Sequence, residues 1–229
     1  MKLPVVYVDN HVLVVDKPAG MLSQEDRTKD EDVLSIAKQW VKIEYEKPGA
    51  VYLGLVHRLD RPASGLMVLA RTSKAAARLS EQFKNRTVTK TYLALVEGAP
   101  VKGDVYEDWL QKWDETVRVV EADKKGAKKA KLTILDVRKI GNYSLVRIEL
   151  ATGRAHQIRV QLAARKFPIV GDFRYGSRTH HPGKNLALHA GRLKIEHPTK
   201  KETMVFTSEV PSAWPAEARE YASQMLSKS

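Results

Sequence analysis

The side chains best suited to chemistry gather in two polar segments of the sequence. The first, residues 57–65, reads His-Arg-Leu-Asp-Arg-Pro-Ala-Ser-Gly and has an apolar run on either side. Asp60 lies between Arg58 and Arg61, and nearby positive charge favours the ionised form of a carboxylate. Such a carboxylate serves as a nucleophile, a general base or a metal ligand. A salt bridge that only shapes the turn is the alternative that these residues leave open.

The second polar segment, residues 152–162, reads Thr-Gly-Arg-Ala-His-Gln-Ile-Arg-Val-Gln-Leu. If a helix begins at Thr152, His156 and Arg159 lie on one face, close to a helix N-terminus that attracts anions. This face could bind a phosphate, or hold a catalytic carboxylate through a bidentate arginine. A solvated amphipathic helix without any chemistry explains the same pattern.

Several other enzyme classes do not fit the sequence. Leu59 stands directly before Asp60, which breaks the His-Arg-Asp spacing of a protein-kinase catalytic loop, and there is no Gly-rich phosphate loop. Ser64 lacks the Gly-x-Ser-x-Gly surroundings of a serine hydrolase. The absence of cysteine excludes disulfides, thiolate zinc sites, iron-sulfur ligation and cysteine nucleophiles. The adjacent His180 and His181 have no carboxylate close in sequence, so we expect no metal site.

The apolar pattern around the two segments alternates between the strand period of two and the helical period of 3.6. Strands are expected at 5–8, 12–16, 51–56, 66–70, 88–96, 116–120, 131–137 and 143–151, with two further strand-like runs after residue 165. Helices are expected from Asp30 or Asp32 to about 46, from Ser73 to about 86, at 152–165 and at about 215–226. Because strands outnumber helices and often follow one another directly, the pattern predicts an α+β fold with a mixed or antiparallel sheet.

The chain is basic. Lys and Arg number 39 against 27 Asp and Glu, and the formal charge of +12 favours a polyanionic partner such as nucleic acid. The densest positive run lies from Lys124 to Lys131 and is expected in a mobile loop, either contacting phosphates or simply solvated. Trp109 and Trp113 could stack on bases, but we expect them to be buried. No apolar run is long enough to span a bilayer and the N-terminus lacks a signal core, which predicts a soluble, cytoplasmic protein.

Together and in this order, the two polar segments resemble the RluA family of RNA pseudouridine synthases. Residues 57–66 are similar to the signature loop of that family, and residues 14–20, 90–94, 152–159, 169–176 and 186–190 are similar to its other motifs. Ala63 stands where Thr is commoner, and Gln161 where a second His often follows. Many relatives carry a small N-terminal RNA-binding module, and here we expect the catalytic domain alone, as a single domain over residues 1–229.

The resemblance implies isomerisation of uridine in RNA without any cofactor. The N1–C1′ glycosidic bond breaks, the uracil rotates and C5 is joined to C1′. Asp60 matches the catalytic carboxylate, which adds to the base, adds to the sugar or assists an elimination. Arg159 matches the arginine that pairs with this carboxylate, and Tyr92 the tyrosine that stacks on the uracil and relays the proton leaving C5.

The resemblance also implies further contacts around these three residues. Arg58 matches the residue that fills the gap left by a flipped nucleotide. The other expected RNA contacts are Arg61, His57, Arg154 and His156. Ile158 and Leu188 are candidate apolar walls of the uracil pocket, and ordinary core packing explains both equally well.

The fold implied by the resemblance is the α+β pseudouridine synthase fold, with a mixed, mainly antiparallel sheet and with helices and loops around a central catalytic cleft. The implied partner is structured RNA, a stem-loop of ribosomal or transfer RNA, bound by a monomer without a metal or a membrane. A non-catalytic RNA-binding protein is the rival interpretation, but binding alone does not need Asp60, Tyr92 and Arg159 together. A nucleotide hydrolase would need a phosphate loop or a carboxylate cluster for Mg²⁺, and the sequence has neither.

Overall fold

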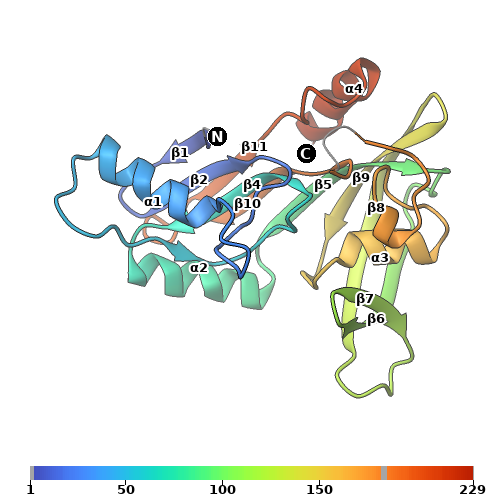
Figure 1. Cartoon of the computed structure of the whole chain (residues 1–229), viewed down its shortest axis with the longest axis horizontal. Helices are drawn as coiled ribbons and strands as arrows, with labels where there is room; N and C mark the ends of the chain where they lie inside the picture. The colour runs from blue at the N-terminus through green and yellow to red at the C-terminus, as the bar shows by residue number, and fades with distance from the viewer. Residues whose placement is uncertain (1–2, 182–184, 229) are drawn as a thin grey trace. The chain divides into compact units, whose positions relative to one another are not determined.

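The structure is a computed structural model that describes residues 3–181 and 185–228. The chain divides into two compact units, each drawn in Figure 1 as strands with helices against them. The first unit consists of Met1–Val88 and Leu193–Ser208, and the second of Thr89–Arg192 and Glu209–Ser229. Both units mix helices with mainly antiparallel strands, which confirms the α+β prediction.

The first unit is built on strands that include the predicted N-terminal hairpin. Its strands are β1 (Val5–Val8), β2 (Val12–Lys17), β3 (Gly54–Leu55), β4 (Ser64–Ala70), the end of β10 (Leu188–Glu196) and β11 (Thr203–Thr207). They are ordered β1-β2-β4-β10, with β3 paired to β4 and β11 to β10. The pairs β1–β2, β2–β4 and β3–β4 are antiparallel. The strand expected at 51–56 is therefore confirmed only over its two-residue core.

Two helices belong to the first unit, α1 (Val33–Glu44) and α2 (Ser73–Asn85). The side chain of Asp32 caps α1 by accepting from the Ser35 amide at 3.0 Å. Thr72, one residue before the predicted Ser73, caps α2 by accepting from the Ala75 amide. One buried hydrophobic cluster joins β2, β4 and α2. It holds β4 in position, and β4 is the strand that follows the Asp60 loop. The cluster includes Val12, Val14, Leu66, Val68, Ala75 and Leu79.

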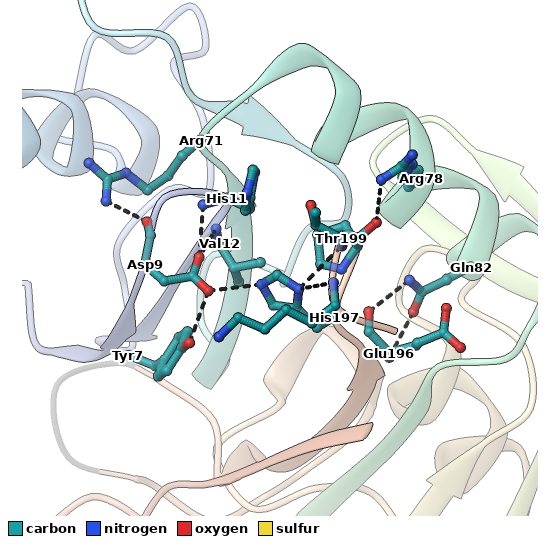
Figure 2. A network of polar contacts seen from close by, with 12 residues as sticks. Tyr7, Asp9, His11, Val12, Arg71, Arg78, Gln82, Glu196, His197 and Thr199 are labelled. Atoms are coloured by element: carbon teal, nitrogen blue, oxygen red, sulfur yellow. Dashed lines mark hydrogen bonds and ion pairs between the residues drawn. The ribbon is translucent and has the colours of Figure 1, made fainter. Parts of the chain in front are cut away.

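A buried polar network ties the connection between β10 and β11 to the start of the chain (Figure 2). His197 is fully buried, and its Nδ1 accepts from the backbone amides of Thr199 and Lys200. Its Nε2 must therefore carry the proton that it donates to Asp9 Oδ2 at 2.8 Å. The opposite oxygen of Asp9 accepts from the His11 and Val12 amides. The network therefore joins the start of the first unit to its last segment.

Replacing Asp9 with Asn is expected to destabilise the protein at neutral pH. Burial raises the pKa of Asp9, but hydrogen bonds from the amides of His11 and Val12 and from Tyr7 and His197 outweigh it and lower the pKa to about 2. A carboxyl whose pKa is lowered on folding stabilises the protein above its ordinary pKa, and this contribution disappears as the pH falls towards 2. We expect Asp9→Asn to lower the free energy of unfolding by about 1–3 kcal/mol at pH 7.

Urea unfolding of the wild type and of Asp9→Asn between pH 7 and pH 2 checks this expectation. The difference between them should shrink as the pH falls from 4 to 2. The control is Glu44→Gln, which changes an exposed carboxylate at the end of α1. A difference that stays constant down to pH 2 would contradict the account.

The second unit contains the longer strands. They are the start of β10, β5 (Thr89–Glu97), β6 (Val105–Trp113), β7 (Thr116–Val120), β8 (Lys128–Ile140) and β9 (Tyr143–Leu150). Their order is β10-β5-β9-β8-β6-β7, so β7 forms the edge. The pairs β5–β9, β8–β9, β6–β8 and β6–β7 are antiparallel. β7 lies at the predicted 116–120, whereas β6 was not predicted.

The strand register separates the two faces of this sheet. Tyr106 and Leu110 of β6 point to the face on which Val160 of α3 (Gln157–Ala164) packs. Arg147 of β9 points to the other face, where its guanidinium donates to the carbonyl of Met225 in α4 (Ala216–Ser227). α3 and α4 thus contact opposite faces of the sheet. The short helix η1 (Phe173–Tyr175) lies against α3.

Candidate active site

Asp60 lies in the first unit, in the loop that leads from β3 into β4. Its carbonyl accepts from the Ala63 amide at 3.1 Å, so Asp60 begins a tight turn that ends where β4 starts. Asp60 is half-buried, while Arg58 and Arg61 on either side are exposed. The loop therefore carries a half-buried carboxylate flanked by two exposed cations.

Two buried side chains fix the backbone on either side of Asp60, and the sequence analysis did not assign them to the site. The hydroxyl of Ser23 donates to the carbonyl of Leu59 and accepts from its amide, at 2.8 and 3.1 Å. On the other side, Lys17 Nζ donates to the carbonyl of Arg61 at 3.0 Å. The two anchors restrict the backbone that carries the Asp60 carboxylate.

Lys17 is the more unusual of the two anchors because it is fully buried. Its Nζ also donates to the carbonyls of Pro18 and Met21, so three carbonyls match the three N–H donors of an ammonium group. Burial lowers the pKa of Lys17 to about 7, while the charge of Asp60 acts in the opposite direction. The Asp60 carboxylate thus lies within electrostatic reach of Lys17. The signal in the sequence was the Asp16-Lys17-Pro18 motif at residues 14–20, which the resemblance used without giving Lys17 a role.

His57 and Arg61, both predicted RNA contacts, also take part in the packing of the first unit. His57 Nε2 accepts from the Val68 amide at 2.9 Å, and its ring stacks on Phe83 of α2 with 4.6 Å between centroids. Arg61 donates to the carbonyl of Gly20 and to Asp30 Oδ2, in an ion pair that is about half exposed. These contacts hold the start and the end of the Asp60 loop.

Arg159 lies in the second unit, and its guanidinium is clamped. Its Nε and Nη2 donate to the two carboxylate oxygens of Asp172 at 2.7 and 2.8 Å, and both side chains are buried. The ring of Tyr175 packs beside the guanidinium, 4.9 Å from Arg159 Cζ. No sequence pattern indicated this pair, although Gly171-Asp172 and Tyr175-Gly176 stand out as motifs. Asp172 and Tyr175 therefore fix the orientation of Arg159.

His156 belongs to the same group of side chains. Tyr175 Oη accepts from the Val117 amide at 2.9 Å and lies 2.8 Å from His156 Nδ1. Tyr175 thus contacts both polar residues of the predicted helical stripe.

The helix expected to begin at Thr152 begins at Gln157 instead, which is a correction. His156 is its N-cap residue and has a left-handed φ of 50°, so His156 and Arg159 do not share a helical face. Before the helix, the Gln157 side-chain oxygen bonds the Thr152 hydroxyl and the Arg154 amide. The Arg154 side chain donates to the Lys129 carbonyl. These local bonds hold the segment before the helix in a non-helical conformation.

Tyr92 on β5 faces the same side of the second unit's sheet as α3. It pairs with Ile148, which pairs with Ile134, and residues directly opposite in antiparallel strands share a face. Ile134 and Leu132 share that face because they are two residues apart, and Leu132 pairs with Tyr106. Tyr92 and the α3 helix that bears Arg159 therefore meet one sheet face. The candidate pocket residues Ile158 and Leu188 are both buried.

Breaking the buried clamp is expected to be costly. Asp172→Asn removes the negative charge that compensates Arg159, and losing one partner of a buried pair costs about 3–5 kcal/mol. Urea unfolding of the variant measures this loss. Glu115→Gln is the matched control, since its pair with Arg174 is long and exposed and should contribute little. Equal stability of Asp172→Asn and the control would refute the role given to the clamp.

Among the residues that the structure describes, no three His, Asp or Glu side chains form a group suited to a metal ion. In the same part of the chain, no helix is long and apolar enough to cross a membrane.

Known proteins resemble this chain in sequence and in fold. A family model described as RNA pseudouridylate synthase matches residues 11–164. The ribosomal large subunit pseudouridine synthase D of Xanthomonas campestris is 35% identical over 91% of the chain, which spans 66% of that relative's length. The tRNA pseudouridine synthase C of Pasteurella multocida is 31% identical over 93% of the chain and 94% of its own length.

Two solved human structures share the fold. Human RNA Pseudouridylate Synthase Domain Containing 4 aligns with a TM-score of 0.73 and 22% identity, over 91% of this chain and 89% of its own. Human RNA Pseudouridylate Synthase Domain Containing 1 aligns with a TM-score of 0.71 and 24% identity, over 100% and 96%. With the family model matching most of the sequence, and the Asp60 loop and the Arg159 segment inside the matched range, the chain belongs to the RNA pseudouridylate synthase family.

Proposed function

We propose that this protein is an isomerase that converts uridine to pseudouridine in structured RNA. The observation that carries the proposal is the family match over residues 11–164, which includes the signature loop around Asp60. The relatives are named for ribosomal and for transfer RNA. We therefore propose stem-loops of ribosomal or transfer RNA as the substrate, and the net charge of +12 suits such a polyanion.

Asp60, Tyr92 and Arg159 are the residues that we propose to carry the reaction, on the basis of the family motifs. The reaction breaks N1–C1′, forms C5–C1′, removes a proton from C5 and returns one to N1. Asp60 is the catalytic carboxylate. The anchors Lys17 and Ser23 support this role because they fix the backbone on both sides of Asp60.

Tyr92 would stack on the uracil and relay the C5 proton through its hydroxyl. Arg159 would compensate the charge of Asp60 in a poorly solvated site. Its clamp by Asp172 supports that role, because an arginine held through Nε and Nη2 presents a fixed guanidinium plane.

The remaining residues are proposed to bind RNA. Arg58 would fill the gap left by the flipped nucleotide, and its exposure suits that role. Ile158 and Leu188 would line the uracil pocket. The RNA contacts would come from Arg61, His57, Arg154 and His156. We further propose that the protein acts as a monomeric catalytic domain in the cytoplasm, without a metal or another cofactor.

Identification of the product tests the proposal. Unmodified transcripts of ribosomal and transfer RNA are incubated with the protein, digested to nucleosides and separated by chromatography. The proposal expects a nucleoside with the mass of uridine and the retention of pseudouridine, at a defined site in at least one transcript. Its absence from every transcript would contradict the proposal.

A further inference from the structure

Two tryptophans that were expected to be buried are exposed on one face of the second unit's sheet. Trp109 and Trp113 of β6 are 37% and 54% exposed. They are four residues apart on one strand, so their side chains lie on the same face. That face is opposite to the one occupied by Tyr106 and Leu110. The tryptophans therefore point away from the face that Tyr92 and α3 share.

Cations alternate with the two rings on this face. Lys129 of β8 lies directly opposite Trp109, and Arg118 of β7 lies opposite Gln111, between the tryptophans. The Arg118 guanidinium lies over the Trp113 ring, 5.2 Å from its centroid. Lys131 lies two residues beyond Lys129 on the same face. We call Trp109, Trp113, Arg118, Lys129 and Lys131 the tryptophan face.

The tryptophan face keeps a positive excess. Glu107 bonds both Lys129 and Lys131, at 2.9 and 2.8 Å, so one carboxylate serves two ammonium groups. Arg118 adds a further positive charge. The loop expected from Lys124 to Lys131 is shorter than expected. β8 begins at Lys128, so the loop ends before that residue.

What remains of that loop lies beside the tryptophan face. Gln111, whose side chain emerges between Trp109 and Trp113, donates to the carbonyl of Lys125 at 2.8 Å. This bond brings Lys125 and its neighbour Lys124 next to the rings. The helix on this side of the sheet, α4, packs mainly against β8 and β9.

We infer that the tryptophan face is a second RNA-binding surface, on which unpaired bases of the substrate stack on Trp109 and Trp113 while the cations contact the adjoining phosphates. Exposed aromatic rings interleaved with cations suit single-stranded nucleic acid, because every base offers a π-face and every linkage a charge. An apolar protein partner would not need the excess of cations. The substrate class rests on the proposed function.

Binding of a single-stranded RNA tests the inference independently of catalysis. The probe is a 12-nucleotide oligouridine labelled with fluorescein, and the readout is fluorescence anisotropy. We expect Trp113→Leu to weaken binding about tenfold, because stacking on one aromatic ring contributes roughly that factor. Trp113→Phe, which keeps a ring, should bind nearly as the wild type. Val101→Ala, at an exposed apolar position before β6, is the control and should change nothing.

Three outcomes decide between the alternatives. Unchanged affinity in Trp113→Leu and in Trp109→Leu would overturn the inference. Loss of self-association in these variants, with RNA binding unchanged, would also overturn it and make the face a contact between copies. Ring-dependent RNA binding in a protein that forms no pseudouridine would support the tryptophan face and contradict the proposed function instead.

Discussion

Asp60→Asn is expected to abolish pseudouridine formation while RNA binding survives. The amide keeps the shape of the side chain but loses the charge and the nucleophilicity that the reaction needs. We expect the turnover rate to fall by on the order of 10³-fold or more, as losses of a central catalytic group do. The backbone should not move, because Ser23 and Lys17 hold the main chain of Leu59 and Arg61 and neither bond involves the Asp60 side chain.

Single-turnover rates and RNA affinities measure this effect separately. Glu44→Gln is the control, since it changes an exposed carboxylate at the end of α1 in the same unit and should leave turnover unchanged. If Asp60→Asn retained more than a tenth of the wild-type rate, another group would have to perform the chemistry.

Tyr92→Phe is expected to bind RNA normally and to lose most of its turnover. Phenylalanine retains the ring that stacks on uracil, but it cannot move a proton, and proton transfer contributes roughly 10²- to 10⁴-fold to such reactions. The loss should therefore lie in kcat rather than in KM.

Steady-state kinetics of Tyr106→Phe provides the control for this variant. Tyr106 is buried on the same sheet face, and its hydroxyl has no hydrogen-bond partner among the described residues. Removing that hydroxyl should leave kcat unchanged. Equal kcat values for the two variants would limit Tyr92 to packing.

The helices and strands with a clear hydrophobic periodicity were predicted close to their observed positions. The hairpin of β1 and β2, the helices α1, α2 and α4 and the strand β7 all lie close to the expected residues. Strand β6 was missed because each of its faces mixes apolar and charged side chains. Leu110 alternates with Asp108 and Lys112, while Trp109 alternates with Glu107, so no period of two appears. The segment nevertheless forms a strand because it pairs with β8, a contact that no local pattern shows.

The sequence predicted the motifs of the site but not the residues that hold their side chains and backbone in place. Asp172 supports Arg159, and Lys17 and Ser23 support the backbone on either side of Asp60. No rule of sequence spacing identifies these supporting residues. Asp172 reaches Arg159 through a turn at Gly171, whose φ is +86° and where a Cβ would come within 2.4 Å of the Asn185 carbonyl oxygen. Lys17 is surrounded by the carbonyls of Pro18, Met21 and Arg61, and no sequence pattern indicates that these three would converge on it.

The prediction that Trp113 is buried was wrong, also because the sequence does not show which elements contact each other. Burial depends on which strands a helix covers, and α4 packs mainly against β8 and β9. Composition favoured a buried tryptophan because aromatic side chains carry much apolar area. The sequence could not say that β7 would be the edge of its sheet.

Release of tritium from RNA labelled at C5 of uridine tests the central claim most directly, because pseudouridine formation replaces the C5–H bond with the C5–C1′ bond. With transcripts of ribosomal and transfer RNA, the wild-type protein should release tritium into water in proportion to the pseudouridine formed, and Asp60→Asn should release none above background. No release by the wild type from any transcript, or equal release by both proteins, would contradict the account.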